Sequence, residues 1–441
     1  MSFAAPRAPY LALAHRDYRR LIVSQLLSLT GSQMQVVAIN WHVYLLTKSP
    51  LALGFVGLTR VVPIIVFSLW GGVLADRHDR RRMMLATQTA MTIVALALAA
   101  ITFAKRESLW LLYVLNALGA AAVAFDGPSR QALIPRLVPP ADLPGALSLN
   151  LSVFQAALIG GPALSGLLIA QAGAGTRGLS LIYLLNALSF LAVIFALATM
   201  RTSGAPEPTA GKVEMSAALR EGLRFVFTTP IMVWTMGLDF LATFFSGATS
   251  LLPIFADQVL RVGAKGYGIL AAAPAVGALA GALYLSIRPL PARQGRIFLW
   301  AVAAYGASTI VFGFSRSFWW TLAALAGAGL ADAISTVIRQ TIRQFATPDR
   351  LRGRMTSINM IFFMGGPQLG ELEAGLVASL FASTVVGVTV SVVSGGIATV
   401  AITAAIAAAA PIVRRYDFRA RDLCASIEER GSGSAGDATP G

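Results

Sequence analysis

Residues 72–84 read Gly-Val-Leu-Ala-Asp-Arg-His-Asp-Arg-Arg-Arg-Met-Met, a charged cluster between two long apolar stretches. A charge inside the hydrocarbon of a bilayer would cost several kcal/mol. The cluster is therefore expected in a tight loop at a membrane face, with an apolar helix on each side. This arrangement is typical of a multi-pass membrane protein.

The composition of the whole chain agrees with that interpretation. Of the 441 residues, 56% are hydrophobic and only 12% are charged, and the mean hydropathy is +0.70. A span of the bilayer needs about 20 mostly apolar residues. Twelve runs meet that length, near 19–46, 52–75, 83–104, 109–128, 144–171, 179–200, 230–255, 267–287, 296–314, 318–341, 354–380 and 385–411.

The net charge of +15 follows the predicted topology and so does not indicate nucleic acid binding. With the amino terminus inside, 27 of the 35 Lys and Arg residues fall on the cytoplasmic side and 7 on the outside, and Arg60 lies within the second span. Positive charge is enriched in cytoplasmic loops. Both termini are therefore expected in the cytoplasm. The protein is expected in the cell inner membrane, and no cleavable signal peptide is expected before the first span.

Several classes of function have no support in the sequence. The single cysteine, Cys424, allows no intramolecular disulfide. We find no nucleotide-binding loop, no metal-ligand cluster and no nucleophile with an accompanying base. We therefore expect neither an enzyme nor a bound cofactor or metal, and the expected partners are a small-molecule substrate, protons and lipid, with the chain as a monomer.

An internal repeat divides the chain into two halves. Shifting the sequence by 209 residues aligns Arg130 with Arg339, Gly161 with Gly370 and Gly166 with Gly375, without a gap. Parallel repeats in transporters are related by an axis along the membrane normal, with a solute path between them. We expect a cytoplasmic segment 1–18, a six-helix bundle 19–200, a linker 201–229 with an amphipathic helix, a second bundle 230–411 and a cytoplasmic tail 412–441.

The loop at 72–84 resembles the loop between the second and third helices of the major facilitator superfamily. The resemblance rests on the order Gly72, Leu74, Asp76, Arg77, Arg80 and Arg81, while Asp79 stands where that pattern usually has glycine. It implies an all-α integral membrane protein with twelve transmembrane helices in two pseudo-symmetric six-helix bundles. Asp76 would then face the start of the eleventh helix, near residues 353–356, and act as a conformational latch with Gly72 and the arginines, although Arg81 and Arg82 are better explained as topogenic charges.

Further stretches narrow the resemblance. Residues 126–138, 251–256 and 365–371 are similar to the branch that contains the enterobactin exporter and the transmembrane secretion effector proteins. Members of this branch are associated with siderophores, macrolides and other amphipathic compounds. A reduced antiporter-like motif in the fifth helix, with Gly160, Gly161, Pro162 and Gly166, supports export only weakly.

Acidic residues inside the predicted spans are the candidates for proton coupling, because charged groups at such depth rarely face lipid. They are Asp239, Asp332, Glu371 and Glu373. The family resemblance favours Asp239 and Asp332, because it implies that the seventh and tenth helices line the cavity. Removal from water disfavours the charged carboxylate, so such a group can load and release protons. The alternative for each acid is a structural role, as a partner of Arg60 or in a helix–helix hydrogen bond. Glu371 and Glu373, two residues apart on a helix, cannot share one face.

Two other sets of polar residues have alternative interpretations. Asp126 and Arg130 have the spacing of an intrahelical pair, or they form a gate or half-to-half contact together with Arg339. Arg60 either compensates an acid or holds an anionic substrate group. The first helix carries a polar face that either lines the substrate cavity or joins helices, formed by Gln25, Ser28, Ser32, Gln35 and His42.

The function predicted from these observations is proton-coupled export of a small amphipathic molecule, a siderophore, macrolide or other drug, by alternating access. A proton entering from outside would neutralise an intramembrane acid and favour one of two conformations. The alternatives are an uptake carrier of the same fold and, from another class, a transport-inactive membrane sensor or scaffold.

Overall fold

The computed structural model describes residues 9–77, 79–172, 176–202, 221, 224–287, 293–347 and 352–417. Most of the expected linker (201–229) and tail (412–441) lies outside these residues. The first half of the described chain begins with a short 3-10 helix, η1 (Pro9–Ala14), which precedes six long helices. These are α1 (Arg16–Thr47), α2 (Pro50–Arg77), α3 (Arg80–Phe103), α4 (Leu109–Leu137), α5 (Leu143–Gln171) and α6 (Arg177–Ala198).

The second half also contains six long helical segments, of which the first is broken. It starts as α8 (Pro230–Phe245) and continues through η2 (Ala248–Leu251), α9 (Leu252–Ile254) and the π-helix η3 (Phe255–Val259). Gly247 and Pro253 lie at the interruptions, as expected where a helix bends. The remaining elements are α10 (Gly263–Ile287), α11 (Gln294–Phe314), α12 (Phe318–Ala346), α13 (Arg352–Ser379), α14 (Thr384–Ala409) and the short α15 (Pro411–Arg414).

Local sequence explains where several helices begin. Ser108 precedes α4 and its hydroxyl accepts a hydrogen bond from Leu111 N at 3.3 Å. Ser383 caps α14 in the same way, through Val386 N. Such caps satisfy backbone N–H groups that have no partner inside the helix. Short polar turns can therefore join long apolar helices.

Eleven segments of the described chain are long and apolar enough to cross a membrane. The predicted span at 354–380 corresponds to α13, which is long enough, at 28 residues, but is not among those eleven. Many side chains in its first half lie outside the described residues. Helix α13 packs against α2, α8 and α14. It carries Gln368, Glu371 and Glu373.

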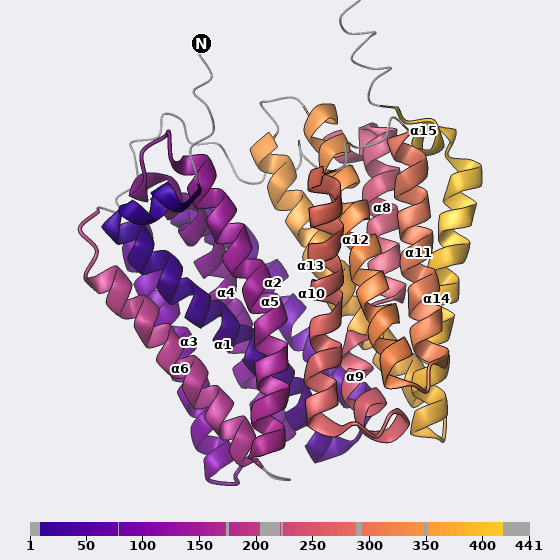
Figure 1. The fold of residues 1–441 in the computed structure, drawn as a ribbon, viewed down its shortest axis with the longest axis horizontal. Helices are drawn as coiled ribbons and strands as arrows, with labels where there is room; N and C mark the ends of the chain where they lie inside the picture. The colour runs from indigo at the N-terminus through magenta and orange to yellow at the C-terminus, as the bar shows by residue number, and fades with distance from the viewer. Residues whose placement is uncertain are drawn as a thin grey trace, which may run out of the picture.

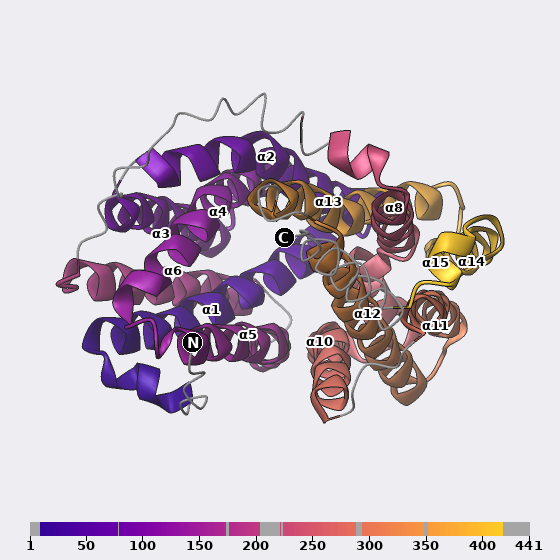
Figure 2. The same ribbon diagram turned by 90° about the horizontal axis from the view of Figure 1, so that it is seen from above.

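The helices form two groups that correspond to the sequence repeat. Helices α1 to α6 pack on one another, and α8 to α14 form the second group (Figures 1 and 2). Helices α4 and α12 both contain 29 residues. Their first residues are 209 positions apart, and so are their last residues, which is the offset found in the sequence. The repeat is therefore a repeat of structure, as expected for this fold.

Two helix pairs make the main contact between the groups, α5 with α10 and α2 with α13. Both contacts depend on glycine. A Cβ added to Gly166 would lie 2.7 Å from Ala264 O and from Gly268 Cα, and one added to Gly54 would lie 2.8 Å from Glu371 O. The backbones touch where these helices cross, which only residues without a side chain allow.

All of these contacts lie near one end of the bundle. They involve the start of α2, the end of α5, the start of α10 and the end of α13. Elements η1 and α15 lie at the other end, toward which the two groups of helices separate (Figure 1). We call the two ends the contact end and the termini end.

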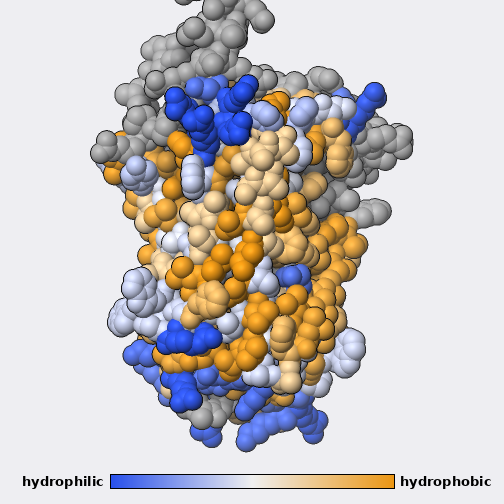
Figure 3. Space-filling view, turned by 90° about the vertical axis from the view of Figure 1, so that its right-hand side faces the viewer, coloured by the Kyte–Doolittle hydropathy of each residue, from blue (hydrophilic) through white to orange (hydrophobic). Residues whose placement is uncertain are grey.

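The outer surface is that of a membrane protein. On the face shown in Figure 3, apolar side chains cover the middle of the molecule and hydrophilic ones gather near its two ends. Many large apolar side chains are exposed, among them Leu118, Leu188 and Ile397. Exposed tryptophans include Trp110, Trp319 and Trp320, which begin helices where an interface would lie.

The glycine contact predicts that Gly166→Val will disfavour closure of the contact end, because overpacking typically costs about 1–3 kcal/mol. Spin labels at Gln171 and Lys265, in a Cys424→Ser background, should report a closed-to-open ratio lower by about tenfold, since about 1.4 kcal/mol corresponds to that factor. Gly160→Val on the same helix is the matched control, since no atom lies within 4 Å of its Cβ position. Equal distances in both variants would contradict the account.

Candidate functional site

The charged loop at the termini end contains a helix cap. Asp79 is the N-cap of α3, and its carboxylate accepts hydrogen bonds from Arg81 N at 2.9 Å and Arg82 N at 3.2 Å. The aspartate that replaces the family glycine thus starts the following helix. The latch contact expected between Asp76 and the start of α13 lies outside the described residues. The structure does not describe the side chains of Asp76 and Arg77, those at 352–354 and 356, or the surroundings of Gly72.

Arg80 and Arg81 bind helix ends within the first group. Arg80 Nη1 donates to Ala132 O in α4 at 3.3 Å, and Arg81 Nη2 donates to Ala198 O at the end of α6 at 2.9 Å. Cations are favoured there because the last carbonyls of a helix carry partial negative charge. In this conformation both arginines join the loop to helices of their own half.

Asp126 is also held within the first group. Its Oδ1 accepts hydrogen bonds from Thr87 Oγ1 at 3.0 Å and from Gln88 Nε2 at 2.9 Å, both on α3. Arg130 is half-buried on α4, and the ion pairs of the described residues do not join it to Asp126. The acid connects α3 to α4.

The second group holds a buried ion pair between Asp239 on α8 and Arg339 on α12. Asp239 is 7% exposed and Arg339 is 5% exposed. Arg339 Nη2 also donates to Thr336 Oγ1 at 3.2 Å. A buried charge is tolerated when it is paired and hydrogen-bonded. Two residues that sequence reasoning placed in different roles, proton coupling and half-to-half contact, are thus partners inside one half.

The polar face of α1 is directed largely at α6. Asn186 Nδ2 donates to Gln35 Oε1 at 2.8 Å, and His42 Nδ1 lies 3.2 Å from Tyr183 Oη. Gln25 and Ser28 are buried as well, while Ser32 is half-buried. The contacts of Gln35 and His42 correspond to the helix–helix alternative.

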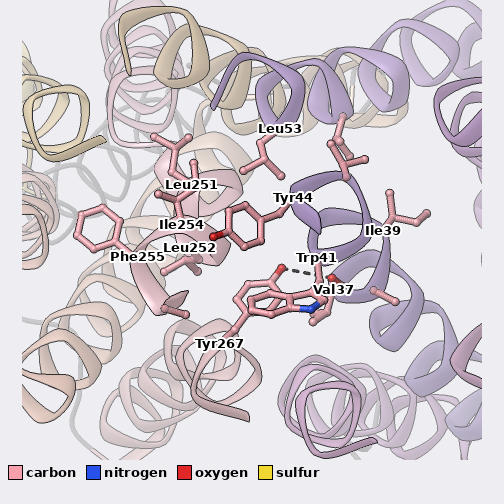
Figure 4. Close-up of a cluster of buried hydrophobic side chains, with 14 of the residues drawn as sticks. Val37, Ile39, Trp41, Tyr44, Leu53, Leu251, Leu252, Ile254, Phe255 and Tyr267 are labelled. Atoms are coloured by element: carbon pink, nitrogen blue, oxygen red, sulfur yellow. Dashed lines mark hydrogen bonds between the residues drawn. The ribbon is translucent and has the colours of Figure 1, made fainter. Parts of the chain in front are cut away.

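Buried apolar and aromatic side chains of both halves form one cluster at the contact end (Figure 4), and hydrogen bonds of its tyrosines join the halves there. Tyr44 Oη on α1 donates to Asp257 Oδ2 on η3 at 2.5 Å and accepts from Gln258 Nε2 at 3.3 Å. Trp41 stacks on Tyr267 of α10 with ring centroids 5.4 Å apart. The Tyr267 hydroxyl donates to Val37 O at 3.4 Å. Sequence reasoning missed Asp257. The available signal was an acidic residue in a segment predicted to lie on the outer side.

The remaining acids differ in their surroundings. Glu371 on α13 is half-buried and accepts a hydrogen bond from Thr249 Oγ1 of η2 at 3.4 Å. Arg60 on α2 lies within electrostatic range of Glu371. Glu373 and Asp332 are also half-buried, and Asp332 lies near Tyr305 of α11. Glu371 lies against the other half, at Gly57 of α2.

The described residues hold no group of three His, Cys, Asp or Glu side chains that could bind a metal ion. The arrangement instead offers two rigid halves, each with its own internal polar contacts. Polar bonds that could break and re-form lie where the halves meet.

Comparisons with known proteins agree with this architecture. A family model described as transmembrane secretion effector matches residues 7–430. The multidrug efflux pump Tap of Mycolicibacterium fortuitum is 26% identical over 79% of this chain and 86% of its own. The enterobactin exporter EntS of Shigella boydii is 24% identical over 83% and 86%. A solved mutant of the nucleoside transporter NupG shares the fold with a TM-score of 0.71 at 11% identity, over 89% of this chain and 99% of that one.

The buried ion pair predicts a double-mutant result. Arg339→Met leaves the Asp239 carboxylate without its partner, and breaking a buried pair typically costs about 3–5 kcal/mol. The melting temperature in detergent should therefore fall clearly for Arg339→Met and for Asp239→Leu alone. The double variant should lie closer to the parent than either single variant does. Additive losses in the double variant would show that the two side chains are not coupled.

Proposed function

Because this chain belongs to the transmembrane secretion effector family of major facilitator transporters, we propose that it is a proton-coupled exporter of a small amphipathic molecule. The family assignment rests on a model that matches nearly the whole chain. The membrane spans and the two helix groups agree with it. The coupling ion, the direction and the substrate class are the proposed part.

The observation that carries the proposal is the confinement of the half-to-half contact to one end of the molecule. Within each half, polar side chains bind helices of the same half, as Asp126 and the Asp239–Arg339 pair do. Between the halves, the described contacts are glycine crossings, one cluster of buried apolar and aromatic side chains, and a few hydrogen bonds. Rigid halves with a small contact can rock, which is the motion that alternating access requires.

The orientation follows from the charge bias of the loops. With both termini in the cytoplasm, the contact end faces outward, so the conformation described here would be closed to the outside. Export then requires the contact end to open after substrate has entered from the cytoplasmic side. Uptake would use the same two conformations in the reverse order.

The substrate class is proposed from chemistry and from the relatives. Tap is an efflux pump for drugs and EntS exports enterobactin. An amphipathic molecule suits a path through apolar helices with few fixed charges. Transport up a gradient needs an energy source, and protons are proposed because the sequence has no nucleotide-binding loop and places acids inside the spans.

The test is flux into proteoliposomes with enterobactin or a macrolide outside and an imposed pH gradient. Proton exchange predicts accumulation when the interior is acidic, because leaving protons drive substrate inward whichever way the protein is inserted. One pH unit supports up to about tenfold accumulation in one-for-one exchange, since about 1.4 kcal/mol corresponds to a factor of ten. A protonophore should abolish it, and liposomes without protein are the control.

The same experiment separates the alternatives. Accumulation only when the exterior is acidic would identify proton-driven uptake and overturn the export proposal. Substrate binding without flux under either gradient would identify a sensor or scaffold.

A further inference from the structure

The contact between α2 and α13 contains a carboxyl group at its centre. Gly54 and Gly57 lie three residues apart on one face of α2, and they meet residues 368, 371, 372 and 375 of α13. A Cβ added to Gly57 would lie 2.6 Å from Glu371 Oε2 and 2.5 Å from the Gln368 carbonyl oxygen. Glycine at position 57 therefore makes room for an acid side chain between the two halves.

The two oxygens of Glu371 have different surroundings. Oε1 accepts a hydrogen bond from Thr249, whose side chain is exposed. Oε2 is buried and has no hydrogen-bond partner in the described structure. Both this oxygen and the Gln368 carbonyl oxygen would contact a Cβ at position 57, so the two helices enclose it closely. A buried carboxylate oxygen without a donor is unfavourable, and protonation removes its charge.

One cation lies near Glu371. Arg60 of α2 is within electrostatic range and attracts the carboxylate, but the ion pairs of the described residues do not include it. Tyr267 lies within electrostatic range on α10. On α8, Asp239 is paired with Arg339. Elements η2 and α14 contain no titratable side chain, and Glu373 on α13 itself projects from another face.

We propose that Glu371 is the proton-binding residue of the half-to-half contact and that it is protonated while α2 is closed on α13. This deepens the proposed function, on which it rests. The proton comes from water when the halves part at the contact end, and it binds Oε2. Closure then buries the neutral carboxyl group against Gly57. Release of the proton to water on the cytoplasmic side, while the contact end is closed, restores the carboxylate, whose burial between the halves favours parting of the two helices.

Asp239 fits this role less well, because Arg339 already neutralises it inside one half. A rocking motion leaves the neighbours of such a pair unchanged. A group can shift a conformational equilibrium only if its interactions differ between the two states. Glu371 meets that condition, since one wall of its site belongs to the other half.

The test measures closure of the contact end against pH, with spin labels at Lys48 and Ala382 in the loops next to α2 and α13 and with Cys424→Ser as background. In the parent, the closed fraction should fall as pH rises, with a slope of up to about tenfold in the closed-to-open ratio per pH unit for one proton. Glu371→Gln mimics the protonated acid, so it should stay closed with a slope near zero. Glu371→Asp keeps an acid and should retain the slope at a shifted midpoint.

Glu107→Gln is the matched control. Glu107 lies in the α3–α4 loop at the contact end and also has a buried carboxyl oxygen without a hydrogen-bond partner in the described structure, but the loop belongs to one half. This variant should respond to pH as the parent does. The proposal is overturned if Glu371→Gln keeps the parental slope, or if Glu107→Gln loses the slope equally.

Flux measurements separate this inference from the proposed function. If the parent and Glu371→Gln both accumulate substrate against a pH gradient, the exporter stands and Glu371 is not its proton site. If the parent transports nothing, yet Glu371→Gln alone abolishes the pH response of the distance, the proton site stands and the exporter proposal fails.

Discussion

The structure depends on the close approach of backbones at two helix crossings between its halves. Gly166 against Gly268, and Gly54 against Gly375, bring α5 to α10 and α2 to α13 near one end of the bundle. In a bilayer, apolar side chains gain little by leaving lipid for protein, so close packing and polar bonds must hold helices together. A contact made in this way is specific but limited in area, and it can therefore open.

The placement of charges follows from the same constraint. Groups that are expensive in hydrocarbon are satisfied inside each half: Asp126 by Thr87 and Gln88, Asp239 by Arg339, and Gln35 by Asn186. Each half can then move as a unit without exposing a charge. Glu371, whose Oε2 is buried without a hydrogen-bond partner in the described structure, lies where the halves meet, and there a change of conformation changes its surroundings.

The sequence predicted the class of the fold well, because run length, loop charge and the 209-residue repeat are properties of one chain segment at a time. It predicted the partners of single residues less well. The spacing of Gln35 and His42 showed that they share a helix face, but a periodic pattern does not tell which neighbour that face meets, and α6 is that neighbour. Asp257 was missed because the π-helical end of a broken span has no simple period.

The central claim is that the two ends of the α5–α10 pair open in alternation. Distances between spin labels at Gln171 and Lys265 report the contact end, and labels at Leu147 and Ile287 report the termini end of the same two helices; all four side chains are exposed. On addition of substrate and a change of pH in lipid nanodiscs, the account predicts that the first distance lengthens while the second shortens. Two distances that lengthen together, or that do not change, would contradict it.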